Sequence, residues 1–185
     1  MKTYLAEQLT VFLEAIDSAL HEPAELVVIG GTAAALHHGV KHPTRDIDTW
    51  NAITRSLATA IDSARRKTGL EIPVAKSGVA GAPEGMEERL ERVLAHLERL
   101  RVLVPEKHDL ALMKMLRANQ HDLDVIAEMH SHSSFDLDVL VDRYENEMDP
   151  VGDPRTIRAN FLALVEVLFP EKVDSVVEKL RPRER

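Results

Sequence analysis

Two short motifs in the N-terminal half of the chain have the residue types of a metal-and-phosphate site. The first is an apolar run that ends in Gly30-Gly31-Thr32, and the second is Asp46-Ile47-Asp48. Residues two apart in a strand point to the same face, so Asp46 and Asp48 would present two carboxylates side by side. Two such oxygen ligands suit Mg2+, which binds one or two carboxylates together with substrate phosphates. The glycines allow close approach of a backbone, and the helix expected after them offers free N–H groups to a phosphate.

A second group of chemically active residues lies at 108–124. Lys114 and Arg117 are three residues apart and therefore share a helix face. Lys114 stands in an otherwise apolar run, and a compact ammonium there can neutralise charge that develops on substrate phosphates. The alternative is a structural lysine that reaches the helix edge or pairs with Asp109 or Glu128. Two acidic residues close the group, either as a further site carboxylate or as a helix cap: Asp122 and Asp124.

The composition excludes several classes of site. The chain has 185 residues and no cysteine, which excludes disulfides, thiolate catalysis and zinc–thiolate centres. The lack of cysteine is compatible with the reducing cytoplasm, where we expect the protein. No apolar run reaches the length of a membrane span, and the first residues open an amphipathic helix rather than a secretory signal. We therefore expect no membrane partner.

The net charge of -8 argues against a broad basic surface for nucleic acid. A local cluster just before the aspartate pair is either a solvated helix end or a set of phosphate contacts: His37, His38, Lys41, His42 and Arg45. If RNA is bound, a focused patch would have to supply the phosphate contacts: Lys41, Arg45, Arg55, Arg65, Arg66 and Lys67. His130 and His132 lack a matching ligand spacing and are expected on the surface rather than in a zinc site.

Hydrophobic periodicity predicts the elements that position these motifs. Helices are expected over 4–20, 32–38 and 52–67, and strands over 26–29, 46–50 and 70–75. The stretch 86–104 is ambiguous, because its first half fits a helix face whereas its second half alternates like a strand; a helix and a hairpin both stay open. Further helices are expected over 108–129, 136–144 and 153–180.

This order of elements indicates an α+β fold: a small mixed sheet with flanking helices, followed by a helical C-terminal part. We expect a core over 1–105 and a helical part over 106–185, packed as one unit. A Rossmann fold would continue the alternation and would carry a G-x-G-x-x-G turn, and a Walker-type site would carry a lysine after its glycines. The chain has neither pattern.

The two glycines, the following helix and the Asp-x-Asp strand resemble the signature of the polymerase-β-type nucleotidyltransferase superfamily. The later sequence Asp109-Leu110-Ala111-Leu112-Met113-Lys114, continuing through Arg117 to Asp122 and Asp124, is similar to the downstream motif of its minimal bacterial branch. That branch includes the AbiEii-type toxins of toxin–antitoxin and phage-defence systems. The resemblance covers about residues 24–130 and implies the nucleotidyltransferase fold.

The resemblance also implies roles for individual residues. Asp46 and Asp48 would hold Mg2+, and Lys114 and Asp122 would complete the catalytic set. The triphosphate would be contacted by a further group: Gly30, Gly31, Thr32, Arg45 and Arg117. Superfamily members usually have a third carboxylate on a neighbouring strand, and Glu88 is our candidate if its stretch is extended. If that stretch is helical, the third ligand must come from Asp122 or Asp124.

The function that the resemblance implies is Mg2+-dependent transfer of NMP from an NTP to an acceptor. The acceptor would be an RNA, such as tRNA, or a protein, and the chain would be the toxin of a toxin–antitoxin pair with a cognate antitoxin. The alternative is a catalytically inactive member that keeps the fold as a module for binding nucleotide or a protein partner.

Overall fold

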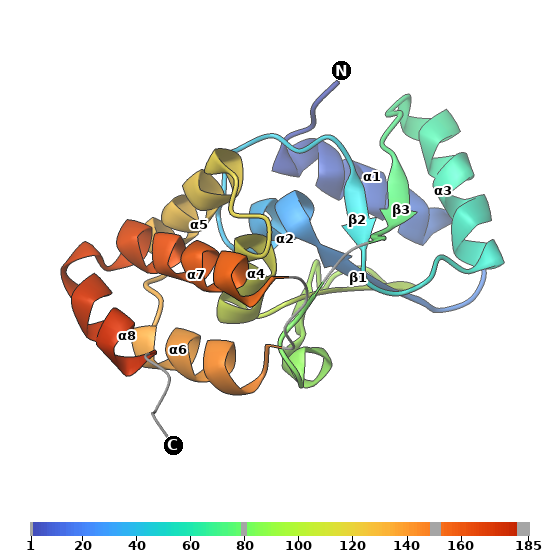
Figure 1. Cartoon of the computed structure of the whole chain (residues 1–185). Coiled ribbons are helices and arrows are strands. Elements are labelled where there is room, and N and C mark those ends of the chain that lie inside the picture. The colour runs from blue at the N-terminus through green and yellow to red at the C-terminus, as the bar shows by residue number, and fades with distance from the viewer. Residues whose placement is uncertain (1, 79–80, 149–152, 181–185) are drawn as a thin grey trace. The chain divides into compact units, whose positions relative to one another are not determined.

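The computed structural model describes residues 2–78, 81–148 and 153–180 (Figure 1). The internal contacts divide the chain into two compact units. Unit 1 comprises Met1–Ala80 and Met86–Glu106, and unit 2 comprises Gly81–Gly85 and Lys107–Arg185. The expected packing of the two parts as one unit stays a prediction. Within the described ranges, no helix combines the length and the apolar character needed to cross a membrane.

Unit 1 contains a five-stranded mixed sheet in the order β3-β2-β1-β5-β4, within the residues described. Its strands are β1 (Ala24–Ile29), β2 (Ile47–Thr49), β3 (Val74–Lys76), β4 (Glu91–Val93) and β5 (Leu100–Val104). Strand β1 is central, because it pairs antiparallel with β2 and parallel with β5. Strand β3 extends the sheet parallel to β2, and β4 extends it antiparallel to β5. The aspartate motif therefore lies on the strand next to the centre.

The helices of unit 1 are α1 (Ala6–Ala19), α2 (Gly30–His37), α3 (Arg55–Thr68) and the 3-10 helix η1 (Met86–Arg89). Helix α1 buries an apolar stripe at helical spacing, which includes Leu9, Phe12 and Ile16, and it packs against α3 (Figure 1). The Thr54 side chain caps the start of α3, and Gly69 ends the helix in the left-handed conformation, with a φ of 69°.

Unit 2 is helical. Its elements are α4 (Lys107–Met115), α5 (Gln120–His132), α6 (Leu137–Asn146), α7 (Pro154–Leu168), η2 (Pro170–Lys172) and α8 (Val173–Lys179). The side chains of Asp136 and Asp153 cap α6 and α7 by accepting hydrogen bonds from the first N–H groups of each helix. Helix α4 packs against α5, α6 and α7, and the ring of Tyr144 stacks on Phe161 at 4.0 Å between centroids.

These elements confirm the predicted fold class, a small mixed sheet with flanking helices and a helical C-terminal part. The open choice over 86–104 resolves as the short helix η1 followed by the β4–β5 hairpin. The single helix expected over 108–129 is wrong, because α4 ends at Met115 and α5 starts at Gln120. Between them Ala118 has a φ of 40°, and the Asn119 side chain caps α5 by accepting from the Asp122 N–H. The apolar residues on either side of the break, Leu116 and Leu123, are seven residues apart and so keep helical spacing, which conceals the break although the residues between them are mostly polar.

Asp17 connects α1 to the start of β5. Its Oδ1 atom accepts hydrogen bonds from the backbone N–H groups of Arg99, at 2.7 Å, and Leu100, at 2.6 Å. Partial burial raises the pKa of Asp17, but the hydrogen bonds from these backbone groups outweigh it and hold the pKa below its usual 3.8. The carboxylate therefore stabilises the entry into the strand that pairs with β1.

Replacing Asp17 by alanine should lower the free energy of unfolding by roughly 1–2 kcal/mol, because two N–H groups lose a charged acceptor at a partly exposed position. The contribution of the lowered pKa is fully present above 3.8 and is lost as the pH falls through the folded-state value. Urea denaturation near neutral pH and at the lowest pH at which both proteins fold measures this difference. Asp17→Asn keeps an acceptor oxygen and should lose less; a difference between wild type and Asp17→Ala that does not shrink in acid would contradict the assignment.

Candidate functional site

The glycine turn lies directly beside the second aspartate. Ile29, the last residue of β1, is paired with Asp48 on β2, so the chain enters α2 next to the Asp48 side chain. Gly30 has a φ of +68°, a conformation that L side chains rarely adopt, and a Cβ atom there would lie 3.5 Å from Asp48 Oδ2. A backbone turn and a carboxylate therefore meet at one edge of the β1–β2 pair.

Two threonine hydroxyls fix the backbone of the first aspartate. Thr32 Oγ1 donates to the Asp46 carbonyl oxygen at 2.7 Å, and Thr44 Oγ1 donates to the same oxygen at 3.3 Å. The Thr44 backbone is paired in turn with Tyr4 through hydrogen bonds of 2.7 and 3.0 Å. A Cβ atom on Gly31 would lie only 3.0 Å from Thr44 Oγ1. Thr32 is 1% exposed, so its visible role is to hold Asp46, and its contact with a triphosphate stays a prediction.

Asp46 and Asp48 lie on the partly exposed side of β2. Burial alternates along this stretch: Ile47 and Thr49 are buried, whereas both aspartates are partly exposed. The strand is shorter than the expected 46–50, because Asp46 occupies a bend just before it. The alternation nevertheless places both carboxylates on one side, as the spacing predicts.

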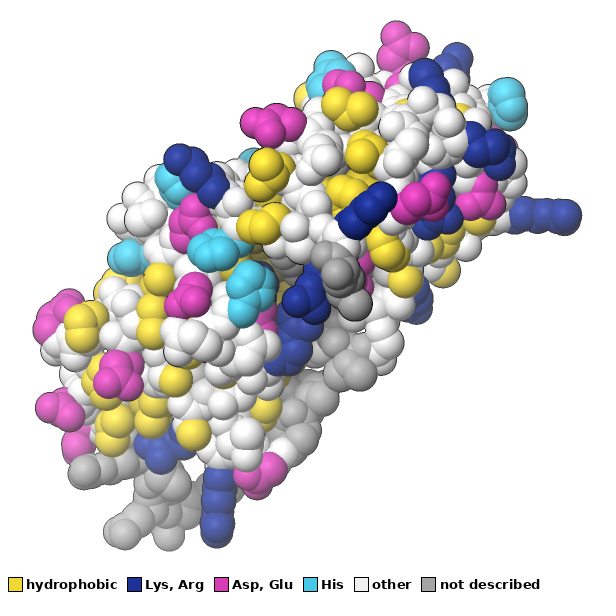
Figure 2. Space-filling model, turned by 90° about the horizontal axis from the view of Figure 1, so that it is seen from above, with side chains coloured by type: hydrophobic (Ala, Val, Ile, Leu, Met, Phe, Trp, Pro, Cys, Tyr) yellow, Lys and Arg dark blue, Asp and Glu magenta, His cyan; other side chains and the backbone are white. Residues whose placement is uncertain are grey.

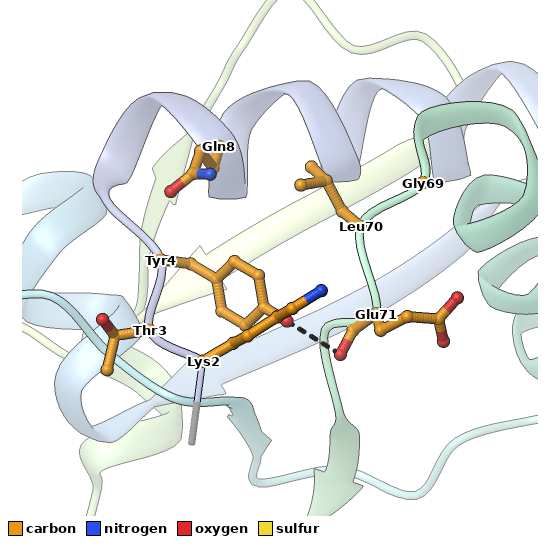
Figure 3. A pocket seen from close by; sticks show the side chains of 7 residues that line it. All are labelled: Lys2, Thr3, Tyr4, Gln8, Gly69, Leu70 and Glu71. Atoms are coloured by element: carbon orange, nitrogen blue, oxygen red, sulfur yellow. Dashed lines mark hydrogen bonds between the residues drawn. The ribbon is translucent and has the colours of Figure 1, made fainter.

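Asp46 also borders a pocket. Together with Arg45 it lines a space of about 570 Å³, whose other walls are Lys2, Tyr4, Glu71 and Pro73. A smaller pocket of about 270 Å³ shares Lys2, Tyr4 and Glu71 with it (Figure 3). The Tyr4 hydroxyl donates to the Glu71 carbonyl oxygen at 3.0 Å, which ties the N-terminal segment to the α3–β3 connection. The room next to Asp46 is therefore bounded by charges of both signs.

The condition attached to Glu88 is not met. Its stretch forms the 3-10 helix η1 rather than a strand, and Glu88 is exposed there. On β3, the residue opposite Asp48 is Ala75, so that neighbouring strand offers no carboxylate at this register. Among the residues that the structure describes, no three His, Asp or Glu side chains gather as a metal-binding group. The site in unit 1 therefore rests on two carboxylates.

The histidine-rich cluster before the aspartate pair is only partly cationic. His37 Nε2 lies 2.8 Å from Glu91 Oε2 on β4. His38 is buried, with Nε2 3.3 Å from the Pro105 carbonyl oxygen. Burial and the neighbouring His37 lower the pKa of His38 below 6.5, so this ring is neutral at neutral pH.

The focused basic patch expected for RNA stays a prediction. One of its members, Arg65, pairs with Asp62 at 2.9 Å and donates to the Ile72 carbonyl oxygen, so its guanidinium has structural partners. On the face drawn in Figure 2, Lys and Arg side chains are interspersed with Asp and Glu side chains.

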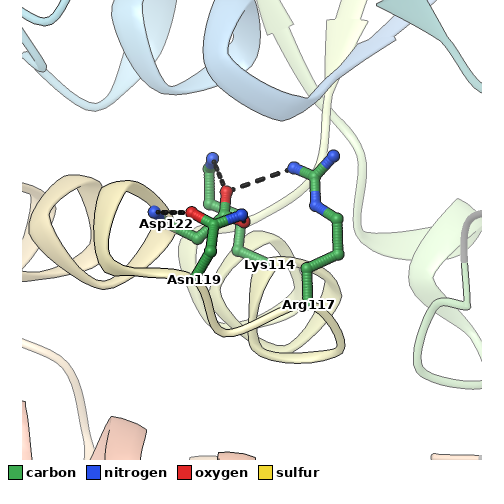
Figure 4. Close-up of polar contacts among 4 residues, drawn as sticks. All are labelled: Lys114, Arg117, Asn119 and Asp122. Atoms are coloured by element: carbon green, nitrogen blue, oxygen red, sulfur yellow. Dashed lines mark hydrogen bonds and ion pairs between the residues drawn. The ribbon is translucent and has the colours of Figure 1, made fainter.

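The predicted residues of the downstream motif form a compact group in unit 2. Asp122 Oδ1 accepts from Lys114 Nζ at 3.0 Å and from Arg117 Nη2 at 3.1 Å, and Asn119 Nδ2 donates to Asp122 Oδ2 at 2.8 Å (Figure 4). The Lys114 and Asp122 side chains are 3% and 2% exposed, whereas Arg117 is 63% exposed. Asp124 is exposed and accepts from Gln120. The catalytic roles of Lys114 and Asp122 and the nucleotide contact of Arg117 stay predictions.

Three residues near the site have structural roles that the sequence analysis did not predict. Thr44 holds Asp46, as described above. Asn51 bridges β1, because its Oδ1 accepts from the Val27 N–H at 2.8 Å and its Nδ2 donates to the Glu25 carbonyl oxygen at 2.9 Å. Trp50 donates from Nε1 to Glu87 Oε1 at 2.7 Å. Only Trp50 had a usable signal, its position two residues after Asp48 in an alternating strand.

Gly30→Ala and Gly69→Ala form a matched pair that separates backbone strain from site geometry. Both glycines have a φ near +69°, but a Cβ atom at Gly69 meets nothing within 4 Å. Each alanine should lower the free energy of unfolding by about 1–2 kcal/mol through the left-handed conformation. Only Gly30→Ala should also weaken binding of Mg2+ and inorganic triphosphate, by roughly tenfold, the equivalent of one charge-assisted hydrogen bond. Calorimetric titration measures the binding; equal affinity of the two variants would contradict a phosphate-binding turn.

Asp122→Ala should lower the free energy of unfolding by about 1.5–3 kcal/mol, because it removes a charged hydrogen-bond partner of the buried Lys114 ammonium. Lys114→Met should cost less, since it removes the buried charge and leaves Asp122 its contacts with Arg117 and Asn119. Asp124→Ala, at an exposed position on the same helix, serves as the control and should change stability by no more than about 0.5 kcal/mol. Denaturation followed by circular dichroism measures all three. An Asp122→Ala variant as stable as Asp124→Ala would show that the buried pair does not hold α4 to α5.

One comparison with known proteins identifies a family for this chain. The family model described as "Nucleotidyltransferase of unknown function (DUF6036)" matches residues 7–163, from α1 into α7. This range includes the glycine turn, the aspartate pair and the group around Asp122. A comparison with curated proteins gave no match, and neither did a comparison with solved structures. The chain belongs to the nucleotidyltransferase family of unknown function described by that model.

Proposed function

We propose that this protein transfers a nucleoside monophosphate from an NTP to an RNA or protein acceptor in a Mg2+-dependent reaction. The family assignment supports the class of reaction. The single observation that carries the proposal further is the position of Gly30 beside Asp48, since a Cβ atom on Gly30 would lie 3.5 Å from Asp48 Oδ2. A phosphate bound at the turn would therefore lie next to the carboxylates.

The donor set at the site fits Mg2+. Asp46 and Asp48 provide hard oxygen ligands on the partly exposed side of β2, and they would hold the metal. Two carboxylates are sufficient, because Mg2+ keeps several waters and completes its octahedral shell with substrate phosphate oxygens. When bound, the metal would stabilise the negative charge that develops on the acceptor oxygen and on the leaving pyrophosphate.

The backbone of unit 1 is arranged to bind and orient the triphosphate. The first N–H groups of α2 have no partner within their own helix and can donate to phosphate oxygens, and Gly30 and Gly31 leave room for close approach. The hydroxyls of Thr32 and Thr44 hold the backbone of Asp46 in place. The backbone that carries the first carboxylate therefore does not have to become ordered when substrate binds. These groups would hold the donor triphosphate beside the carboxylates, where an acceptor could attack the α-phosphorus.

The proposed reaction forms one bond and breaks one. An acceptor hydroxyl oxygen bonds to the α-phosphorus, the bond from that phosphorus to the α–β bridging oxygen breaks, and pyrophosphate leaves with the electron pair. The hydroxyl proton passes to solvent. The glycine turn and the carboxylates would accelerate this step by orienting the donor and by holding positive charge near the transferred group.

The finer assignments rest on the resemblance alone. Lys114 would stabilise negative charge on the transferred group, and Asp122 would be its acidic partner in the downstream motif. The role of the chain as an AbiEii-type toxin with a cognate antitoxin is part of the same proposal.

The test is transfer of label from each α-³²P-labelled NTP, in the presence of Mg2+, to total RNA or to total cellular protein. Wild type should label one of the two acceptors, and Asp46→Asn with Asp48→Asn should reduce labelling by roughly 10³-fold or more, because the residues that bind the metal lose their charge. The matched control is Asp62→Asn, which removes an exposed carboxylate of α3 away from the site.

The outcomes separate the two hypotheses. Equal labelling by wild type and the double variant would overturn the metal assignment. Binding of Mg2+–NTP without any transfer to either acceptor would favour a non-catalytic nucleotide-binding module. Chelation of divalent cations should abolish labelling by wild type and leave its fold intact, as judged by circular dichroism.

A further inference from the structure

Trp50 is the only tryptophan of the chain and lies two residues after Asp48. Its backbone continues the β1–β2 ladder, because the Trp50 N–H donates to the Val27 carbonyl oxygen at 2.8 Å. Burial also continues to alternate: Thr49 is buried, whereas Trp50 is partly exposed like Asp48. The indole ring therefore lies on the same side of the strand as the aspartate pair, about 7 Å farther along the backbone.

The indole ring is held in place by its polar edge. Nε1 donates to Glu87 Oε1 at 2.7 Å, and Glu87 belongs to η1, which is anchored by the buried Met86. The backbone on either side of Trp50 is also fixed, because Thr49 Oγ1 donates to the Asn51 carbonyl oxygen at 2.9 Å and the Asn51 side chain bridges to β1. The indole N–H is satisfied by Glu87, and Trp50 as a whole is partly exposed, so the residue offers an aromatic ring beside the aspartate pair.

We propose that Trp50 is the surface on which the base of the donor NTP stacks, an inference that rests on the function proposed above. The glycine turn faces Asp48 from one end of β1, and Trp50 lies beyond Asp48 in the opposite direction along β2. A nucleotide whose phosphates bind at the turn and at Asp48 has its base one ribose away, on the side of Trp50. An aromatic ring can stack on any of the four bases, because each base has a π face.

This placement predicts that the protein selects among NTPs by the size of the base rather than by the hydrogen-bond pattern of the base. Purine bases cover more of the indole ring than pyrimidine bases, so ATP and GTP should bind more tightly than CTP and UTP. Glu87 acts as a positioning residue, because it touches the indole N–H rather than the base.

The experiment uses the intrinsic fluorescence of the full-length protein, which reports on Trp50 alone. The protein is titrated with each NTP and with inorganic triphosphate in the presence of Mg2+, with excitation where nucleotides do not absorb. NTPs should quench the fluorescence, and purine nucleotides should do so at lower concentrations. Inorganic triphosphate should compete with ATP for the site and leave the fluorescence nearly unchanged, because it has no base.

Variants provide the second measurement. Trp50→Leu should weaken ATP binding by roughly 10- to 100-fold and leave the affinity for inorganic triphosphate unchanged, whereas Trp50→Phe should restore most of the ATP affinity. Glu87→Ala should weaken ATP binding less than Trp50→Leu, and Glu87→Gln, which keeps an acceptor oxygen, should resemble wild type. Unfolding free energies of all variants show whether each remains folded.

Three results would overturn the inference. Trp50→Leu could retain the wild-type ratio of ATP to triphosphate affinity, in which case the base does not stack there although the phosphate site stands. A single-stranded oligonucleotide could quench Trp50 while NTPs do not, which would assign the ring to the acceptor. Failure of wild type to bind inorganic triphosphate or any NTP would overturn the proposed function together with this inference.

Discussion

The backbone carbonyl of Asp46 accepts hydrogen bonds from two threonine hydroxyls, and the geometry of the site depends on this shared acceptor. Thr32 reaches it from the first turns of α2, and Thr44 reaches it from the segment that pairs with Tyr4. The start of β2 is therefore fixed to the helix that follows the glycine turn. Without these contacts, a loop of roughly ten residues between α2 and β2 would leave the first carboxylate free to move.

The sheet holds Asp48 in a strand that is paired on both sides. Strand β2 is held on both sides, by β1 and by β3, and the residues opposite Asp48 are Ile29 and Ala75, neither of which carries charge. Under the proposed function, this paired strand would keep the Asp48 carboxylate beside the glycine turn, so this part of the site would need little rearrangement when a cation binds.

Elements of the fold could be predicted from the sequence where a local hydrophobic pattern alone determines the secondary structure. The strand before Gly30, the placement of Asp46 and Asp48 on one side and the helix near 136–144 were predictable, because hydrophobic periodicity is a local signal. The break at 116–119 was missed because Leu116 and Leu123, on either side of it, keep helical spacing, although Asn119 is a good cap. The hydroxyl contacts to Asp46 and the buried Lys114–Asp122 pair could not be predicted, since which groups meet depends on how distant elements fold together.

The segment Gly81–Gly85 belongs to unit 2, although the residues on either side of it belong to unit 1. Its partners lie far ahead in the chain: the Glu84 N–H donates to the Glu147 carbonyl oxygen at 2.8 Å, and Pro83 forms a bridge with Met148. During synthesis on the ribosome, the sheet of unit 1 has all of its strands once residue 104 has emerged, but this segment must wait for about 40 more residues. Unit 1 can therefore fold first around an insertion whose own partner does not yet exist, and the order of synthesis matches the order of assembly.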